Sequence, residues 1–101
     1  MHIISLKALR LFWQKHPSAE TALKHWHTVV EQTEFESFQQ VREAFASADY
    51  AAPFTIFDIA GNHYRLITAM HYNTGKVFIR HVFTHSEYDE WNKQQRKNRR
   101  K

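Results

Sequence analysis

The chain has 101 residues, of which 43% are hydrophobic and 15% aromatic, so one folded domain with a single core is expected rather than a disordered segment. No apolar run approaches the ~20 residues that span a bilayer, and no secretory signal is expected. The absence of cysteine excludes disulfides and thiolate metal ligands and fits a reducing compartment. We therefore expect a cytoplasmic domain with no membrane partner.

The positive charge is concentrated at the C-terminal end. Six of the 14 cationic side chains lie in the last ten residues: Lys93, Arg96, Lys97, Arg99, Arg100 and Lys101. Without them, eight cationic and ten acidic side chains remain, a formal net charge of −2 against +4 for the whole chain. A basic terminus attracts polyanions through phosphate contacts, although a solvated end that docks an acidic partner has the same composition. We expect one domain over residues 1–92 and a basic tail over residues 93–101.

The N-terminal part predicts a short strand followed by helices. Residues 2–4 can add an edge strand to a sheet. Ser5 is a candidate N-cap for a helix that ends at His16, because the residue before a proline disfavours the helical region. Ser18 is expected to begin a second helix, whose apolar residues recur at helical spacing.

A third helix is predicted after Ser37, which forms a capping box with Gln40. The segment 46–53 that follows is expected to be a connection. Three strands rich in Ile, Val, Phe, Tyr and Thr come next. They are residues 54–59, 64–72 and 76–84.

Turns separate these strands at residues 61–62 and 73–75, where Gly and Asn accept the positive φ of tight hairpins. Ser86 is expected to cap a C-terminal helix with Glu87 in its first turn. The pattern predicts an α+β fold. An antiparallel sheet would pack against two or three N-terminal helices and carry a short C-terminal helix.

Polar side chains that do not suit a core are concentrated on the predicted strands and just after them. They are Asn62, His63, Arg65, His71, Lys76, Arg80, His81, His85 and Tyr88. Guanidinium, imidazole and phenol groups held near one another suit a phosphate-binding site.

Arg65 and Arg80 each interrupt an apolar strand. An unpaired buried charge is costly, so Arg65 must face a cleft, where its fork suits phosphate oxygens, or form an ion pair with Asp58 on the neighbouring strand. Arg80 is expected to share a face with its i±2 neighbours. Whether the two arginines share a face depends on the register through the turn at 73–75, because a one-residue slip reverses the faces.

His85 and Tyr88 are three residues apart where a strand becomes a helix, so their side chains can converge. An imidazole carries protons near neutral pH, and a phenol can donate a proton or stack on a base. The alternative is a capping histidine beside a core tyrosine. The eight histidines do not predict a metal site, since His81 and His85 would lie about 13 Å apart along a strand. We expect neither a metal nor a cofactor.

Three motifs occur together in the C-terminal half. They are Gly61-Asn62-x-x-Arg65, Phe78-Ile79-Arg80-x-Val82-x-Thr84-His85 and Glu87-Tyr88-Asp89. With these motifs the chain resembles the HigB-type toxins of bacterial toxin–antitoxin pairs, a branch of the RelE-like mRNA interferases, over nearly its whole length. One departure is Ala60, where many relatives have a second glycine before Gly61.

The resemblance implies a RelE-like fold and metal-independent cleavage of mRNA, often on the translating ribosome. The ribose 2′-OH would attack the adjacent phosphate and give a 2′,3′-cyclic phosphate and a 5′-OH. The catalytic candidates are Arg65, Arg80, His85 and Tyr88. The candidates for substrate binding are Asn62, His63, Lys76 and Thr84. The implied partners are mRNA, the ribosome and a cognate HigA-like, DNA-binding antitoxin.

Two other functions fit the same residues. One is a non-catalytic RNA- or ribosome-binding module that uses the basic face and tail. The other is an inactive relative that only binds an antitoxin-like repressor. Among the three, the enzyme alone predicts a cut RNA strand with a cyclic phosphate end.

Overall fold

A computed structural model describes residues 1–99, with side chains placed up to residue 97. The helical elements are α1 (Leu6–Lys15), the 3₁₀ turn η1 (Pro17–Ala19), α2 (Glu20–Glu31), α3 (Phe38–Ala44) and α4 (His85–Arg99). The strands are β1 (His2–Ile4), β2 (Asp49–Ala51), β3 (Phe54–Ile59), β4 (Tyr64–His71) and β5 (Lys76–Thr84). The predicted α+β class is confirmed.

The five strands form one sheet in the order β1-β5-β4-β3-β2. The pairs from β5 to β2 are antiparallel, as alternation and hairpin turns predict. The short strand β1 joins the other edge in parallel with β5, so the sheet is mixed rather than purely antiparallel. Its role as an added edge strand is confirmed.

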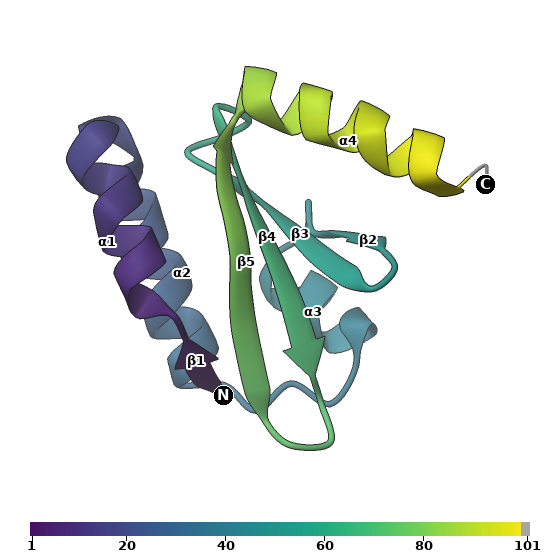
Figure 1. Ribbon diagram of the computed structural model, residues 1–101. Helices are drawn as coiled ribbons and strands as arrows, with labels where there is room; N and C mark the ends of the chain where they lie inside the picture. The colour runs from purple at the N-terminus through teal and green to yellow at the C-terminus, as the bar shows by residue number, and fades with distance from the viewer. Residues whose placement is uncertain (100–101) are drawn as a thin grey trace.

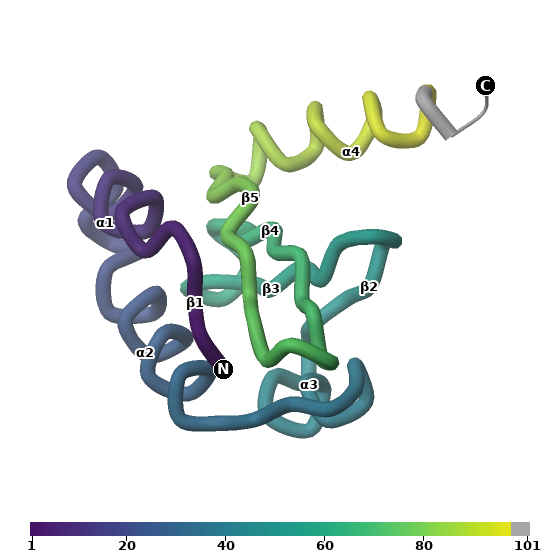
Figure 2. The backbone as a smooth tube through the Cα atoms, turned by 60° about the horizontal axis from the view of Figure 1, so that its bottom comes forward, coloured from purple at the N-terminus to yellow at the C-terminus, as the bar shows by residue number. Residues whose placement is uncertain are grey.

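The helices divide between the two faces of the sheet (Figure 1). The first three helices supply the main core against one face, through side chains that include Leu9, Leu23, Trp26 and Val41. Helix α4 packs against β4 and β5 at the other end of the chain (Figure 2). No helix within residues 1–99 is both long and apolar enough to cross a membrane.

The main core is centred on Phe57 of β3, which is 1% exposed. Its ring meets Trp26 of α2 edge-on at 5.4 Å and Phe45, just after α3, at 5.2 Å. Fully burying side chains of this kind stabilises a fold by about 1.5–3 kcal/mol each. The Trp26 Nε1–H group is buried without a hydrogen-bond partner among the described residues, so this ring contributes by packing alone.

Two predicted helix starts differ from the structure. Ser5 does precede α1, but it has a φ of 79° and its side chain makes no capping hydrogen bond. The prediction that Ser18 begins the second helix is wrong, because η1 intervenes and α2 begins at Glu20. The Ser18 hydroxyl instead hydrogen-bonds the hydroxyl of Tyr64 on β4, a tertiary contact that local sequence does not reveal.

The capping box before α3 is confirmed in its main contact. Ser37 Oγ accepts a hydrogen bond from the Gln40 backbone N–H at 3.3 Å. The Gln40 side chain reaches back one residue further than predicted and accepts from the Glu36 N–H at 2.8 Å. The segment 46–53, predicted as a connection, contains the edge strand β2, which pairs with β3.

The predicted cap of the last helix is wrong by two residues. Thr84 caps α4 rather than Ser86: Thr84 Oγ1 accepts from the Glu87 N–H at 3.3 Å, and Glu87 Oε1 accepts from the Thr84 N–H at 2.8 Å. These reciprocal bonds form a capping box, which explains why strand and helix meet without a loop. The helix continues to Arg99, across the boundary predicted at residue 92, whereas Arg100 and Lys101 lie outside the described residues.

Candidate functional site

Arg65 of β4 is held by several partners at once. Its Nε lies 3.0 Å from Asp58 Oδ1 on β3, an ion pair, and its Nη1 donates to the backbone carbonyls of Asn62 (2.9 Å) and Tyr64 (3.2 Å). Its guanidinium carbon lies 5.4 Å from the centroid of the Tyr88 ring, a cation–π contact. The ion pair that the sequence allowed is therefore present. Nη2 makes no hydrogen bond within residues 1–99.

A cavity of about 370 Å³, which we call the Arg65 pocket, opens beside this guanidinium. Segments from α3, β2, β3, β4 and α4 line it. The lining residues are Arg42, Ala46, Ser47, Ala48, Asp49, Ile56, Asp58, Arg65 and Tyr88. Two arginines, two aspartates and a phenol therefore share one open cavity.

Partial burial raises the pKa of the Tyr88 phenol above its usual 10.0, and the negative charge of Asp49 raises it further. Arg65 acts in the opposite direction. Because the raising effects prevail, the phenol is protonated at neutral pH. Tyr88 is therefore a proton or hydrogen-bond donor there.

His85 begins α4 beside the β3–β4 turn. Its backbone N–H donates to the His63 carbonyl at 3.1 Å, which fixes the helix start against that turn. Its Nε2 lies 3.3 Å from Asp89 Oδ2, one helical turn further along, and its side chain is exposed. Tyr88 is three residues on, so it lies on a neighbouring part of the helix surface. An imidazole with a carboxylate partner thus stands one turn from the Arg65 pocket.

A β-bulge at Arg80 decides the register that the sequence left open. On one side of it Ile67 pairs with His81, and on the other Thr68 pairs with Ile79, so Arg80 has no partner on β4. His81 therefore faces α4, and so does Phe83, which pairs with Arg65. The prediction that Arg80 shares a face with Val82 is wrong, because the extra residue at the bulge puts the two side chains on opposite faces.

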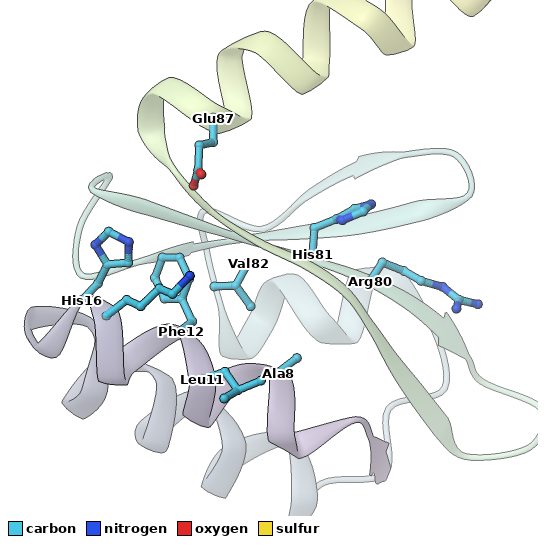
Figure 3. A pocket seen from close by; sticks show the side chains of 9 residues that line it. Ala8, Leu11, Phe12, His16, Arg80, His81, Val82 and Glu87 are labelled. Atoms are coloured by element: carbon cyan, nitrogen blue, oxygen red, sulfur yellow. The ribbon is translucent and has the colours of Figure 1, made fainter.

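The Arg80 side chain is exposed and points away from the core (Figure 3). Its guanidinium carbon lies 5.3 Å from the Phe78 ring centroid. In Figure 3, Arg80 and His81 point away from α1 while Val82 points toward it. A second cavity of about 360 Å³ lies along this part of β5, between it and Phe12 of α1 and His16, which follows that helix. The outer edge of β5 is open there, because β1 pairs only with Lys76, Val77 and Phe78.

The structure brings six of the eight predicted site residues to one end of the sheet, where the β3–β4 turn meets α4. They are Asn62, His63, Arg65, Thr84, His85 and Tyr88. Arg80 lies further along β5 at the bulge. Lys76 lies at the opposite end of that strand, paired with His2 and His71, roughly 26 Å from Thr84 at about 3.3 Å per residue.

Sequence reasoning missed Arg42, Ser47 and Asp49 as pocket residues. They belong to α3, the following loop and β2, and no local motif ties them to Arg65. Within residues 1–99, no three His, Cys, Asp or Glu side chains lie close enough to hold a metal ion.

Comparison with known proteins bears on this site. A model of the HigB toxin family, described as the RelE-like toxic component of a toxin–antitoxin system, matches residues 19–91. The mRNA interferase HigB of Escherichia coli O6:H1 is 29% identical over 102 aligned residues, which cover 98% of this chain and 99% of that protein. The mRNA interferase toxin HigB of Escherichia coli strain K12 and the mRNA interferase HigB of Shigella flexneri are each 30% identical, over 88% of both chains. The matched region contains Arg65, His85 and Tyr88.

Proposed function

The chain belongs to the HigB family of RelE-like toxins, the toxic components of toxin–antitoxin systems, and we propose that it is an endoribonuclease that cleaves mRNA. The names of its relatives support this activity. The observation that carries the proposal is the placement of Arg65 against Tyr88 in an open pocket, with His85 one helical turn away. These are the groups that splitting a phosphodiester by its own ribose requires.

The proposed reaction begins with the ribose 2′-OH. It loses its proton to a base as its oxygen attacks the adjacent phosphorus, and an acid protonates the departing 5′ oxygen, which leaves a 2′,3′-cyclic phosphate and a 5′-OH. Arg65 offers its free Nη2 and its charge to the phosphate oxygens. The protonated Tyr88 phenol suits the donor role, and His85, paired with Asp89, suits the base. Each acid or base contributes on the order of 10²–10⁴-fold.

The remaining predicted residues take supporting positions in this proposal. Asn62, His63 and Thr84 surround the scissile group at the β3–β4 turn. Arg80 binds a phosphate further along the RNA strand, in line with its position at the bulge. Lys76 is too far along β5 to reach the same phosphate, so any contact that it makes is with a distant part of the substrate or with the ribosome.

The proposed partners follow from the family and from the charge. A cognate HigA-like, DNA-binding antitoxin would neutralise the toxin in the cytoplasm, and the ribosome would present the mRNA. The exposed cations Lys93, Arg96 and Lys97 on α4 suit contact with ribosomal RNA or with the message. The same cations would serve a module that binds RNA without cutting it, so cleavage is the decisive property.

Expression in bacteria without an antitoxin, followed by primer extension, tests the proposal. The wild type should arrest growth and leave cut messages with cyclic phosphate ends. Repeating the induction with translation blocked shows whether cutting depends on the ribosome. Arg65→Ala should lower cleavage on the order of 10²–10³-fold, because it removes the charge that faces the phosphate.

Arg10→Ala is the matched control, since it removes an exposed arginine from α1, outside the Arg65 pocket. It should cut like the wild type. A folded Arg65→Ala protein that arrests growth as strongly as the wild type would refute the site. A wild type that binds RNA but leaves it intact would establish the non-catalytic module instead.

A further inference from the structure

The Arg65 pocket extends beyond the groups that the proposed chemistry needs. Away from Arg65, its wall contains Asp49 of β2 and Ser47 in the loop before it. Its apolar part is made by Ala48 and Ile56, which are 4% and 3% exposed. This part of the pocket has hydrogen-bonding groups at its rim and a small apolar surface inside, but no role in splitting the phosphodiester.

Asp49 is placed to receive a donor from a ligand. Its Oδ1 accepts the backbone N–H of Tyr50 at 2.9 Å, and Oδ2 makes no hydrogen bond among the described residues. Its charge is also the strongest single-charge influence on the Tyr88 phenol across the cavity. The carboxylate therefore acts on the pocket interior.

The Arg42 guanidinium lines the same cavity and attracts anions, but the exposed Asp49 carboxylate repels a phosphate that comes directly beside it. The carboxylate favours a group with N–H donors, which it can pair without a proton transfer. In an RNA strand those donors belong to the bases, and unpaired bases are read on their Watson–Crick edges while their faces meet apolar or aromatic side chains.

We propose that this part of the pocket binds one unpaired RNA base next to the scissile phosphate, and that Asp49 selects a base with an exocyclic amino group over uracil. The inference rests on the proposed function for the presence of RNA in the pocket. Adenine, cytosine and guanine offer an amino N–H to Asp49 Oδ2. Uracil places carbonyl oxygens on both sides of its single Watson–Crick N–H, and these repel the carboxylate.

Cytosine and uracil provide the sharpest comparison, because they have the same size and stack similarly. They differ at position 4, where cytosine has an amino group and uracil has a carbonyl. The probes are fluorescently labelled 2′-O-methyl hexamers of cytidine and of uridine, which cannot be cleaved through the 2′ oxygen. Affinities are measured by fluorescence anisotropy at fixed salt. Any contact of the cationic end of α4 is with phosphates, which the two probes share, so it should cancel in the ratio of affinities.

The wild type should bind the cytidine hexamer about three- to tenfold more tightly than the uridine hexamer. This is the range expected when one probe makes a hydrogen bond that the other cannot make. Asp49→Asn should bring the ratio to about one or reverse it, since an amide N–H can pair with the uracil carbonyl. Asp49→Ala should also remove the preference. Glu43→Gln, which removes an exposed carboxylate from α3 outside this pocket, should keep it.

A wild type without a cytidine preference, or an unchanged ratio in both folded Asp49 variants, would overturn the inference. These outcomes are independent of the proposed activity, because the probes are not cut. If Arg65→Ala cleaved mRNA normally while the Asp49 variants lost the preference, the catalytic assignment would fail and the base pocket would stand. If cleavage required Arg65 but the ratio ignored Asp49, the base pocket alone would fail.

Discussion

The two faces of the sheet are built from similar strands but differ in what they bury. Toward α1, α2 and α3, the strands present Phe57, Leu66 and Val77, each at most 1% exposed, to a closed apolar core. Toward α4, Ile56 and Ile67 are also buried, at 3% and 0% exposure, but they lie outside the main core cluster. That second face also carries charged and titratable groups.

The second face is completed by one helix and a few aromatic rings. Trp91 of α4 lies 5.5 Å from Phe54, 5.9 Å from Phe83 and 5.9 Å from His81, and it remains only partly buried. The comparison teaches that the closed core lies on one face of the sheet and the candidate site lies on the other. One face holds most of the fully buried side chains, and the other leaves ionisable groups accessible, as the proposed site requires.

The largest expected effect is on the closed face. Trp26→Ala should lower the free energy of unfolding by about 3–5 kcal/mol, because it leaves a cavity beside Phe57. Trp26→Phe should cost far less, since the indole N–H makes no hydrogen bond that the change could break. Urea unfolding followed by circular dichroism measures both. Equal losses in the two variants would contradict a stabilising role for Trp26 through ring packing.

A tryptophan on the open face should matter less for stability and more for activity. Trp91→Ala should cost about 2 kcal/mol, because a half-buried side chain returns less area to water. It should also lower RNA cleavage in the folded protein, since Tyr88 and Trp91 lie 6.1 Å apart on the same helix. Trp91→Phe is the control that keeps a ring there. Cleavage per folded molecule that is unchanged in Trp91→Ala would break the proposed division between the faces.

The β3–β4 turn tests whether the fold can be stabilised without touching either face. Ala60 has a φ of 53°, in the left-handed region that favours glycine. Ala60→Gly should raise the free energy of unfolding by about 0.5 kcal/mol, the relief of backbone strain less the added freedom of the unfolded chain. Thermal unfolding should show a rise of a few degrees, with RNA cleavage unaltered. A fall in the melting temperature would show that the turn is not strained.

The smallest effect expected is a pH dependence from the open face. Burial lowers the pKa of His81 below its usual 6.5, and the nearby Arg80 lowers it further. The unfolded chain then binds a proton more readily, so stability should fall as pH drops through 6.5 toward the folded-state pKa. His81→Gln should reduce the difference between urea midpoints at pH 7.5 and pH 5.5. His25→Gln, an exposed change on α2, is the control and should leave more of that difference.

The elements that the sequence predicted well are those with a long periodic pattern or a clear cap. Strands β3, β4 and β5 follow from their β-branched and aromatic composition, and α3 follows from the Ser37 box. The strand β2 was not predicted because a three-residue edge has no periodicity of its own and forms by pairing with β3. The cap of α4 was misassigned because Thr84 and Ser86 both suit an N-cap, and the choice depends on where β5 ends.

The candidate site divides in the same way. Arg65, His85 and Tyr88 could be named as candidates from residue type and position, together with the family resemblance, and they stay a prediction. The place of Arg80 could not be predicted, since a bulge leaves no mark on the alternation of β5. Asp49 could not either, because its approach to Tyr88 depends on how β2 returns beside β3.

The continuous course of α4 has one further consequence. Its 15 residues extend over about 22 Å, from the Thr84 cap to a cationic end that projects beyond the strands in Figure 1. In the proposed function, the helix would act as a short, stiff tether between a cationic end that captures RNA and the Arg65 pocket. A nucleic acid held at Lys93 and Arg96 is confined within a few nanometres of Tyr88, which corresponds to an effective concentration on the order of millimolar. One rigid element would thereby couple the first contact with RNA to its docking in the pocket.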